Sequence, residues 1–151
     1  MLQNYQNILI AIDGSNQALL AYEKALEVAK RNKGKLYLAN IIDINALNTI
    51  SLDGSEMYNL LFEEANKLLD DYIKKAQEKN FTNIEKIVEF GSARELIARE
   101  LISKYHIDLI MLGATGKSAL SRLLLGSVSE YVTRTAQCDV LIVRTDLDNK
   151  K

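Results

Sequence analysis

Short apolar runs and amphipathic stretches alternate along the whole chain. Five runs rich in aliphatic residues have the length of buried strands, at 8–12, 36–42, 84–90, 109–112 and 140–143. Between them, apolar residues recur every three or four positions, which is typical of a helix with one buried face. Strands that alternate with helical crossovers predict an α/β fold, with an open parallel sheet covered by helices on both faces.

The helical stretches carry recognisable start signals. Ser15 suits the N-cap of a first helix that ends near Gly34. The apolar positions of this helix predict the core stripe Ala18, Tyr22, Ala25, Leu26 and Ala29. An irregular segment, Asp43–Met57, precedes the second helix, whose stripe is Leu61, Ala65, Leu68, Leu69, Tyr72 and Ala76. Two capping boxes, Ser92-x-x-Glu95 and Ser127-x-x-Glu130, predict the starts of two further helices.

A glycine-rich segment follows the fourth predicted strand. Gly113 and Gly116 are followed, after nine residues, by Gly126 and Ser127 at the entry to a short helix. Glycine has no Cβ, so its backbone can approach phosphate oxygens closely, and the unpaired N–H groups of a helix N-terminus supply donors. The segment therefore predicts a phosphate site, with a nucleotide as the expected ligand.

The spacing of these glycines differs from two common phosphate motifs. A P-loop requires glycine where the chain has Met111, and Ala114 and Thr115 break a dinucleotide fingerprint. The remaining pattern, Gly-x-x-Gly-x9-Gly-Ser, resembles the ATP-binding pattern of the universal stress protein family. Three other segments resemble the first strand and turn, the entry to the last helix and the last strand of that family: Ile8–Ser15, Leu123–Val132 and Val140–Val143. The resemblance extends over about residues 5 to 145.

At 151 residues the chain suits one domain, 1–151, and residues 146–151 are expected to form a frayed tail. The resemblance implies the strand order 3-2-1-4-5. In that order the strand sequence reverses between strands one and four, so the turns at Asp13 and Gly113 meet at one crevice. The implied ligands are ATP, or ADP or an AMP-like nucleotide, and Mg²⁺ or Mn²⁺ bound with the phosphates. The order also leaves the last strand at a sheet edge, where the family pairs two copies into a homodimer through Val140, Leu141, Ile142 and Val143.

The implied nucleotide contacts fall into three groups. Residues at the strand ends would hold the nucleoside: Ala11, Ile12, Asp13, Ile41 and Leu112. Residues of the glycine-rich segment would hold the phosphates: Gly113, Gly116, Gly126, Ser127, Val128 and Ser129. Weaker support for the phosphates is expected from Thr115, Lys117 and Arg122. Each group also has a purely structural interpretation, as turn glycines, helix caps or core residues.

Charge and composition limit the classes of partner and the location that the sequence predicts. With 19 basic and 20 acidic residues the net charge is −1, which gives no electrostatic reason to expect nucleic acid or a membrane surface as the main partner. No apolar run has the length of a membrane span and Met1–Asn7 lacks an export signal, so the cytoplasm is the expected location. Cys138, the only cysteine, is interpreted as a small buried residue, and His106, the only histidine, as a loop residue that binds no metal.

The predicted function is a small stress-response regulator that uses a nucleotide as its ligand. A slow ATPase or self-phosphorylating enzyme is the main alternative, although Asp13 is the only evident acidic candidate for catalysis and is expected to lie nearer the nucleoside than the phosphates. A receiver-type signalling domain is a second alternative with the same layered architecture. That class needs several acidic residues after strand one and an aspartate at the end of strand three, where this chain has Glu89-Phe90-Gly91.

Overall fold

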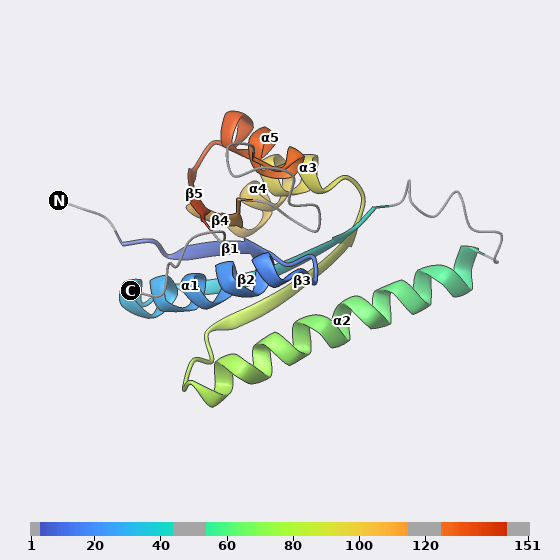
Figure 1. The fold of residues 1–151 in the computed structure, drawn as a ribbon, viewed down its shortest axis with the longest axis horizontal. Coiled ribbons are helices and arrows are strands. Elements are labelled where there is room, and N and C mark those ends of the chain that lie inside the picture. Colours follow the sequence, from blue (N-terminus) through green and yellow to red (C-terminus); the bar gives the residue numbers. More distant parts are fainter. Residues whose placement is uncertain (1–3, 44–53, 115–124, 145–151) are drawn as a thin grey trace.

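A five-stranded parallel sheet forms the centre of the computed structural model, which describes residues 4–43, 54–114 and 125–144. Its strands are β1 (Asn7–Ala11), β2 (Lys35–Ile42), β3 (Ile84–Phe90), β4 (Leu109–Gly113) and β5 (Asp139–Val143). All four neighbouring pairs are parallel, and the strand order is β3-β2-β1-β4-β5 (Figure 1). The predicted α/β class and strand order are confirmed.

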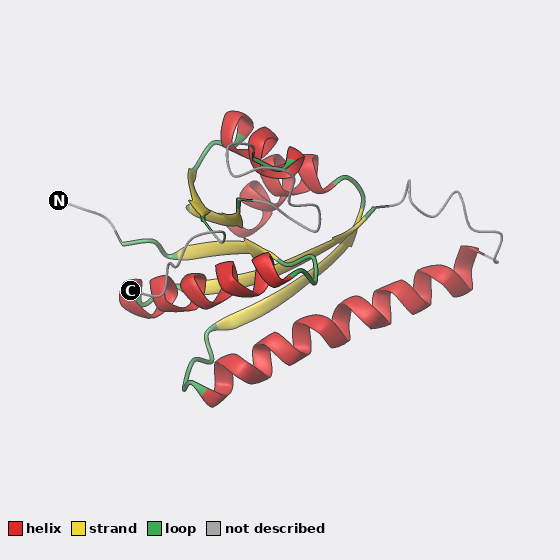
Figure 2. Ribbon diagram, viewed as in Figure 1, coloured by secondary structure: helices red, strands yellow, loops and turns green. Residues whose placement is uncertain are grey.

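Helices cover both faces of this sheet (Figure 2). One face carries α1 (Asn16–Asn32) and α2 (Gly54–Glu78), which pack on a core that includes Ile8 and Ile10. The other face packs through Leu9 and Ile110. It carries α3 (Ala93–Glu95), the π-helical turn η2 (Leu96–Glu100), α4 (Leu101–Tyr105) and α5 (Ser127–Thr135). The predicted three-layer arrangement is therefore confirmed. No helix in the described ranges is long and apolar enough to cross a membrane.

β1 lies at the middle of the sheet and is buried on both faces, as its unbroken apolar run predicts. Its three central residues are fully inaccessible to solvent. At its start, the carboxylate of Asp108 accepts hydrogen bonds from the backbone N–H groups of Gln6 (2.7 Å) and Asn7 (3.0 Å). This contact holds β1 and β4 side by side, so that their carboxyl ends reach the same edge of the sheet.

The boundaries of α1 follow from its sequence. The hydroxyl of Ser15 accepts a hydrogen bond from the N–H of Ala18 at 3.1 Å, which confirms the predicted cap, and the whole predicted core stripe is buried. The helix ends at Asn32, before Gly34. A Cβ added to Gly34 would lie 2.5 Å from the carbonyl oxygen of Tyr5, so only glycine fits this close approach of two backbone segments.

Two local predictions are wrong. α2 begins at Gly54, so the last residues of the segment predicted as irregular are helical, while residues 44–53 lie outside the described part of the chain. Ser92 does occupy an N-cap position, but its side chain makes no capping hydrogen bond. The capping box fails because Glu95 turns to α5, where its carboxylate accepts a hydrogen bond from the hydroxyl of Tyr131 at 2.6 Å.

Candidate functional site

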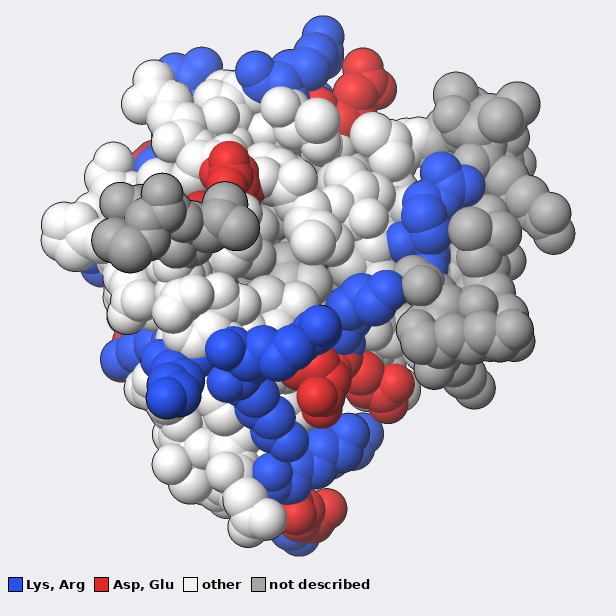
Figure 3. All heavy atoms as spheres, turned by 90° about the vertical axis from the view of Figure 1, so that its left-hand side faces the viewer, with Lys and Arg blue, Asp and Glu red and all other residues white. Residues whose placement is uncertain are grey.

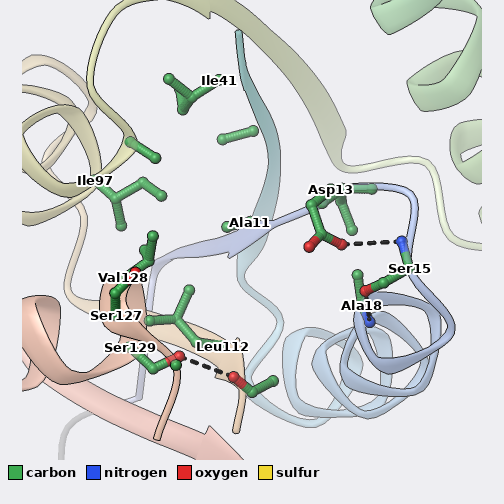
Figure 4. Close-up of a pocket in the computed structure, with 15 residues that line it drawn as sticks. Ala11, Asp13, Ser15, Ala18, Ile41, Ile97, Leu112, Ser127, Val128 and Ser129 are labelled. Atoms are coloured by element: carbon green, nitrogen blue, oxygen red, sulfur yellow. Dashed lines mark hydrogen bonds between the residues drawn. The ribbon is translucent and has the colours of Figure 1, made fainter. Parts of the chain in front are cut away.

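A cavity of about 300 Å³ opens beyond the carboxyl ends of β1 and β4 (Figure 4). This is the point at which the strand order reverses, and open α/β sheets bind their ligands at such points. The cavity is bounded by the ends of β1, β2 and β4, by the start of α1, by α3 and η2, and by the first turn of α5.

The cavity collects predicted site residues from distant parts of the chain. Every described residue of the predicted set lines it: Ala11, Ile12, Asp13, Ile41, Leu112, Gly113, Gly126, Ser127, Val128 and Ser129. The remaining predictions lie outside the described residues: Thr115, Gly116, Lys117 and Arg122. The sequence reasoning missed further lining residues, which are Ser15, Ala18, Ala39, Ala93 and Ile97. Their only sequence signal was an apolar or capping pattern that also fits a plain core.

The turn after β1 places a carboxylate at the rim of the cavity. Asp13 Oδ1 accepts a hydrogen bond from the N–H of Ser15 at 2.9 Å, while Oδ2 accepts none from the described part of the chain. Gly14 has a φ of 84°, a left-handed conformation that glycine adopts without strain. The backbone before Asp13 is also held in place, because the Asn40 side chain donates a hydrogen bond to the Ile12 carbonyl at 3.0 Å. The second oxygen of Asp13 is thus held ready to accept from a ligand hydroxyl or amine.

The first turn of α5 forms the opposite wall, and here the predicted capping box at Ser127 is wrong. Gly126 is the N-cap residue, and its carbonyl accepts the N–H of Glu130 at 2.9 Å. The Glu130 side chain instead pairs with Arg134 at 3.6 Å, so it does not reach back to the helix start. No side chain of the described residues therefore makes a capping hydrogen bond at the start of this helix, because glycine takes the capping position.

The uncapped start of α5 offers hydrogen-bond donors. The N–H groups of Ser127, Val128 and Ser129 have no carbonyl four residues earlier within the helix to bond to. Ser129 is buried and its hydroxyl donates to the Gly113 carbonyl at 2.9 Å, which ties α5 to the end of β4. A helix N-terminus of this kind carries partial positive charge, so this wall favours an anionic group such as phosphate.

The rest of the cavity wall is apolar. Ala39, Ile41, Ala93, Ile97 and Val128 supply small or branched aliphatic side chains. Figure 4 shows Ile41, Ile97 and Val128 across the space from Asp13. Such walls suit a flat, weakly polar group, and aromatic ligand rings bind in pockets of this composition. The hydrogen bond between Tyr131 and Glu95 holds the two helical walls at a set distance from each other.

The remaining candidate side chains stand apart from the cavity. His106 is an exposed residue that ends α4 in a left-handed conformation, which agrees with its interpretation as a loop residue. The described residues contain no group of three or more His, Cys, Asp or Glu side chains that could hold a metal ion. Glu89 pairs with Lys104 at 3.2 Å and does not line the cavity.

Cys138 is expected to react slowly with alkylating reagents. Burial, with a smaller contribution from Asp139, raises the pKa of its thiol to about 11. A raised pKa disfavours the reactive thiolate, so alkylation by iodoacetamide at pH 8 should be about 100-fold slower than for a free cysteine. A pH–rate profile should show its midpoint near 11 in the folded protein and near the free value in urea. A folded-state midpoint below 9 would contradict the burial argument.

An open parallel sheet with a cavity at its strand-order reversal defines the chain as an α/β protein of the doubly wound class. The profile of the universal stress protein family matches residues 4–144, and the chain belongs to this family. It is 44% identical over 147 residues to SH1215 of Staphylococcus haemolyticus, which is assigned to the universal stress proteins, and the match covers 94% of this chain and 86% of that protein.

Solved structures show the same family. UspA from Lactobacillus plantarum is similar with a TM-score of 0.80 and 25% identity, over 95% of this chain and 100% of the other. A universal stress protein in complex with cAMP has a TM-score of 0.71 and 27% identity, over 95% of this chain and 99% of the other. Family membership leaves the receiver-type interpretation without support.

Proposed function

We propose that this protein binds ATP, or ADP or an AMP-like nucleotide, in the cavity at the ends of β1 and β4, and acts in the cytoplasm as a small stress-response regulator. The observation that carries the proposal is the composition of that cavity. It joins apolar walls, one carboxylate and an uncapped helix N-terminus within a single space of about 300 Å³. These groups suit a base, a ribose and phosphates respectively. The similar structure in complex with cAMP supports a nucleotide as the ligand class.

The cavity also suggests the orientation of the nucleotide. The base would lie between the aliphatic side chains around Ile41 and Ile97, and the free oxygen of Asp13 would accept from a nucleoside hydroxyl or amine. The phosphates would lie against Gly113 and the first turn of α5. There the Ser127 hydroxyl could donate to them, whereas the proton of the Ser129 hydroxyl is already engaged by Gly113.

A divalent ion would enter this site with the phosphates. Mg²⁺ and Mn²⁺ prefer oxygen ligands, and the carboxylate among the cavity-lining residues belongs to Asp13. The described residues therefore fit an ion that is held mainly by phosphate oxygens and water, with at most one protein carboxylate. Such an ion would neutralise phosphate charge while the chain itself supplies the N–H donors.

We also propose that two copies pair through β5. This strand lies at the sheet edge, and its Leu141 side chain is 38% exposed although it is apolar. Val143, by contrast, is buried in the core on the face covered by α1 and α2 and has almost no exposed surface to offer to a partner. The proposed contact is thus carried by the open backbone edge together with Val140, Leu141 and Ile142.

Calorimetric titration with ATP, with and without Mg²⁺, tests the proposed ligand. We expect saturable binding of one nucleotide per chain, and mass spectrometry of ligand released by denaturing the purified protein should identify the preferred nucleotide. The proposal would be rejected if ATP, ADP, AMP and cAMP all failed to bind at about 1 mM, because a dissociation constant of that size corresponds to a binding free energy of only about 4 kcal/mol.

The turnover of ATP should stay far below the ~10 s⁻¹ of a typical enzyme. A contaminant-free sample that reached this rate would favour the ATPase alternative.

A further inference from the structure

The core-facing stripe of α2 continues past the part of the helix that the sheet covers. From Ala65 to the end of α2 the stripe is buried, at Ala65, Leu69, Tyr72 and Ala76. At the same helical spacing it extends back to Phe62 and Tyr58, whose side chains are 45% and 38% exposed. Figure 1 shows the start of α2 projecting beyond the sheet. The apolar face of this helix is therefore longer than the surface that covers it.

The last residue of β3 contacts the uncovered part of the stripe. The ring of Phe90 packs edge-on against Tyr58, with centroids 5.1 Å apart, and lies nearly parallel to the ring of Phe62 at 6.4 Å. Leu61 is half-buried beside them. We call Tyr58, Leu61, Phe62 and Phe90 the α2 surface. Clustered, partly exposed aromatic side chains of this kind are typical of protein–protein contact sites.

The charged residues in the first half of α2 all have one sign. Residues 54–66 include three glutamates and no lysine or arginine. Glu56, Glu63 and Glu64 are exposed, and none of them forms an ion pair with the described part of the chain. The second half of α2, residues 67–78, contains three lysines and three acidic residues. The acidic excess is thus confined to the half of the helix whose apolar stripe is uncovered.

A pocket of about 540 Å³ adjoins the α2 surface, between α2 and the ends of β1 and β2. Leu61, Ala65 and Leu68 form its apolar side. Its charged lining residues are the carboxylates Asp13 and Glu64, without a lysine or arginine. A pocket with one apolar side and two carboxylates among its lining residues suits a long basic side chain, whose methylene groups pack against the apolar side while its charged end meets the acids.

We propose that the α2 surface is a docking site for a basic amphipathic helix of another protein. The apolar face of that helix would cover Tyr58, Phe62 and Phe90, and one of its lysines or arginines would enter the pocket beside Glu64. Charge complementarity selects this occupant, because an exposed apolar stripe flanked only by glutamates attracts apolar residues flanked by cations. The pocket shares Asp13 and Ile41 with the cavity proposed for the nucleotide, so docking is tested in the absence of nucleotide.

A second copy of the chain is a poorer fit. A symmetric contact would place the same acidic surface against itself and bring like charges together. Lys and Arg side chains gather on the opposite end of the molecule (Figure 3), which includes the last turns of α1 and α2 with Lys30, Arg31 and Lys75. A contact from that end to the α2 surface of the next copy would be head-to-tail, so it would build rings or open chains and not a two-fold dimer.

Fluorescence anisotropy with two designed peptides tests the proposal without nucleotide. The first is a labelled peptide of about 18 residues, five helical turns, with leucine and lysine at amphipathic spacing. The second replaces every lysine by glutamate. We expect the basic peptide to bind and the acidic peptide to remain free. Phe62→Ser should weaken binding about tenfold or more, as for a central aromatic contact. Leu20→Ser, which changes a 37% exposed leucine on α1, is the matched control and should have no effect.

Charge reversal provides a second variant that does not depend on the apolar contact. The triple substitution Glu56→Lys, Glu63→Lys, Glu64→Lys should reverse the preference for the basic peptide, so that the variant binds the acidic peptide instead. Circular dichroism confirms that each variant is folded. Three results would overturn the proposal: no binding of the basic peptide at about 100 μM, equal weakening by Leu20→Ser, or an unchanged preference in the triple variant. Wild-type self-association that Phe62→Ser abolishes would also overturn it, because a second copy would then occupy the surface.

Discussion

Replacing Gly126 by valine should lower the affinity for ATP by about 100-fold or more while the protein stays folded. Gly126 lines the cavity and precedes the N–H groups of Ser127, Val128 and Ser129. A valine side chain at this position would occupy the space through which a phosphate approaches those donors. Hydrogen bonds to charged groups contribute about 1.5 to 3 kcal/mol each, so the loss of two gives at least the stated change.

The backbone conformation of Gly126 explains why the fold should survive this change. Its φ of −63° and ψ of 161° are allowed for any residue, so valine introduces no backbone strain. Ala136 at the other end of α5 has nearly the same conformation, with φ −62° and ψ 140°. Ala136→Val is therefore the matched control and should bind ATP as the unchanged protein does. Calorimetry measures the ATP affinity of the two variants, and thermal unfolding shows whether they are folded. Wild-type affinity in a folded Gly126→Val variant would exclude this wall as the phosphate site.

Ile142→Pro should convert the proposed homodimer into a folded monomer. In a parallel strand the N–H and C=O of one residue point to the same side, and the side alternates along the strand. The carbonyl of Val143 accepts a hydrogen bond from the N–H of Ala114, just after β4, so the backbone groups of Val143 and Leu141 point towards β4. Val140 and Ile142 consequently direct their backbone groups to the open edge. Proline at 142 removes an edge N–H without removing a hydrogen bond of the sheet itself.

Symmetry doubles the effect of this substitution. A two-fold contact loses the edge hydrogen bond on both strands, about 2 kcal/mol in total, which corresponds to about a 30-fold weaker dimer. Ile142→Val keeps the N–H and the branched side chain, so it should remain dimeric. Leu141→Lys, which places a charge on the exposed leucine, should also dissociate the dimer. Sedimentation at micromolar concentration measures the mass of each variant. A monomeric wild-type protein, or a dimeric Ile142→Pro, would reject the edge contact.

The local patterns of the chain determined most of the fold. The unbroken apolar runs around β1 and β4 predicted buried parallel strands, and the core stripe of α1 from Ala18 to Ala29 was read correctly because its period matches one helical face. The glycines at 113 and 126, together with Asp13, indicated the two turns that line the cavity. These features were visible because each depends on residues close in sequence, or on a pattern shared with a known family.

Only the tertiary structure decided which of the predicted local interactions are made. The capping boxes at Ser92 and Ser127 looked equivalent in sequence, but Glu95 bonds to Tyr131 and Glu130 pairs with Arg134. Tyr131 lies on another helix, so sequence spacing alone cannot identify it as the partner of Glu95. Arg134 lies four residues after Glu130, a spacing typical of helical ion pairs, but the sequence does not decide between this pair and a capping bond. The tertiary structure also showed that Ala93 and Ile97 line the cavity. It showed further that the apolar stripe of α2 extends beyond the part of the helix that packs on the sheet. An apolar period predicts that a face will be buried, but what covers that face depends on how far the neighbouring strands extend.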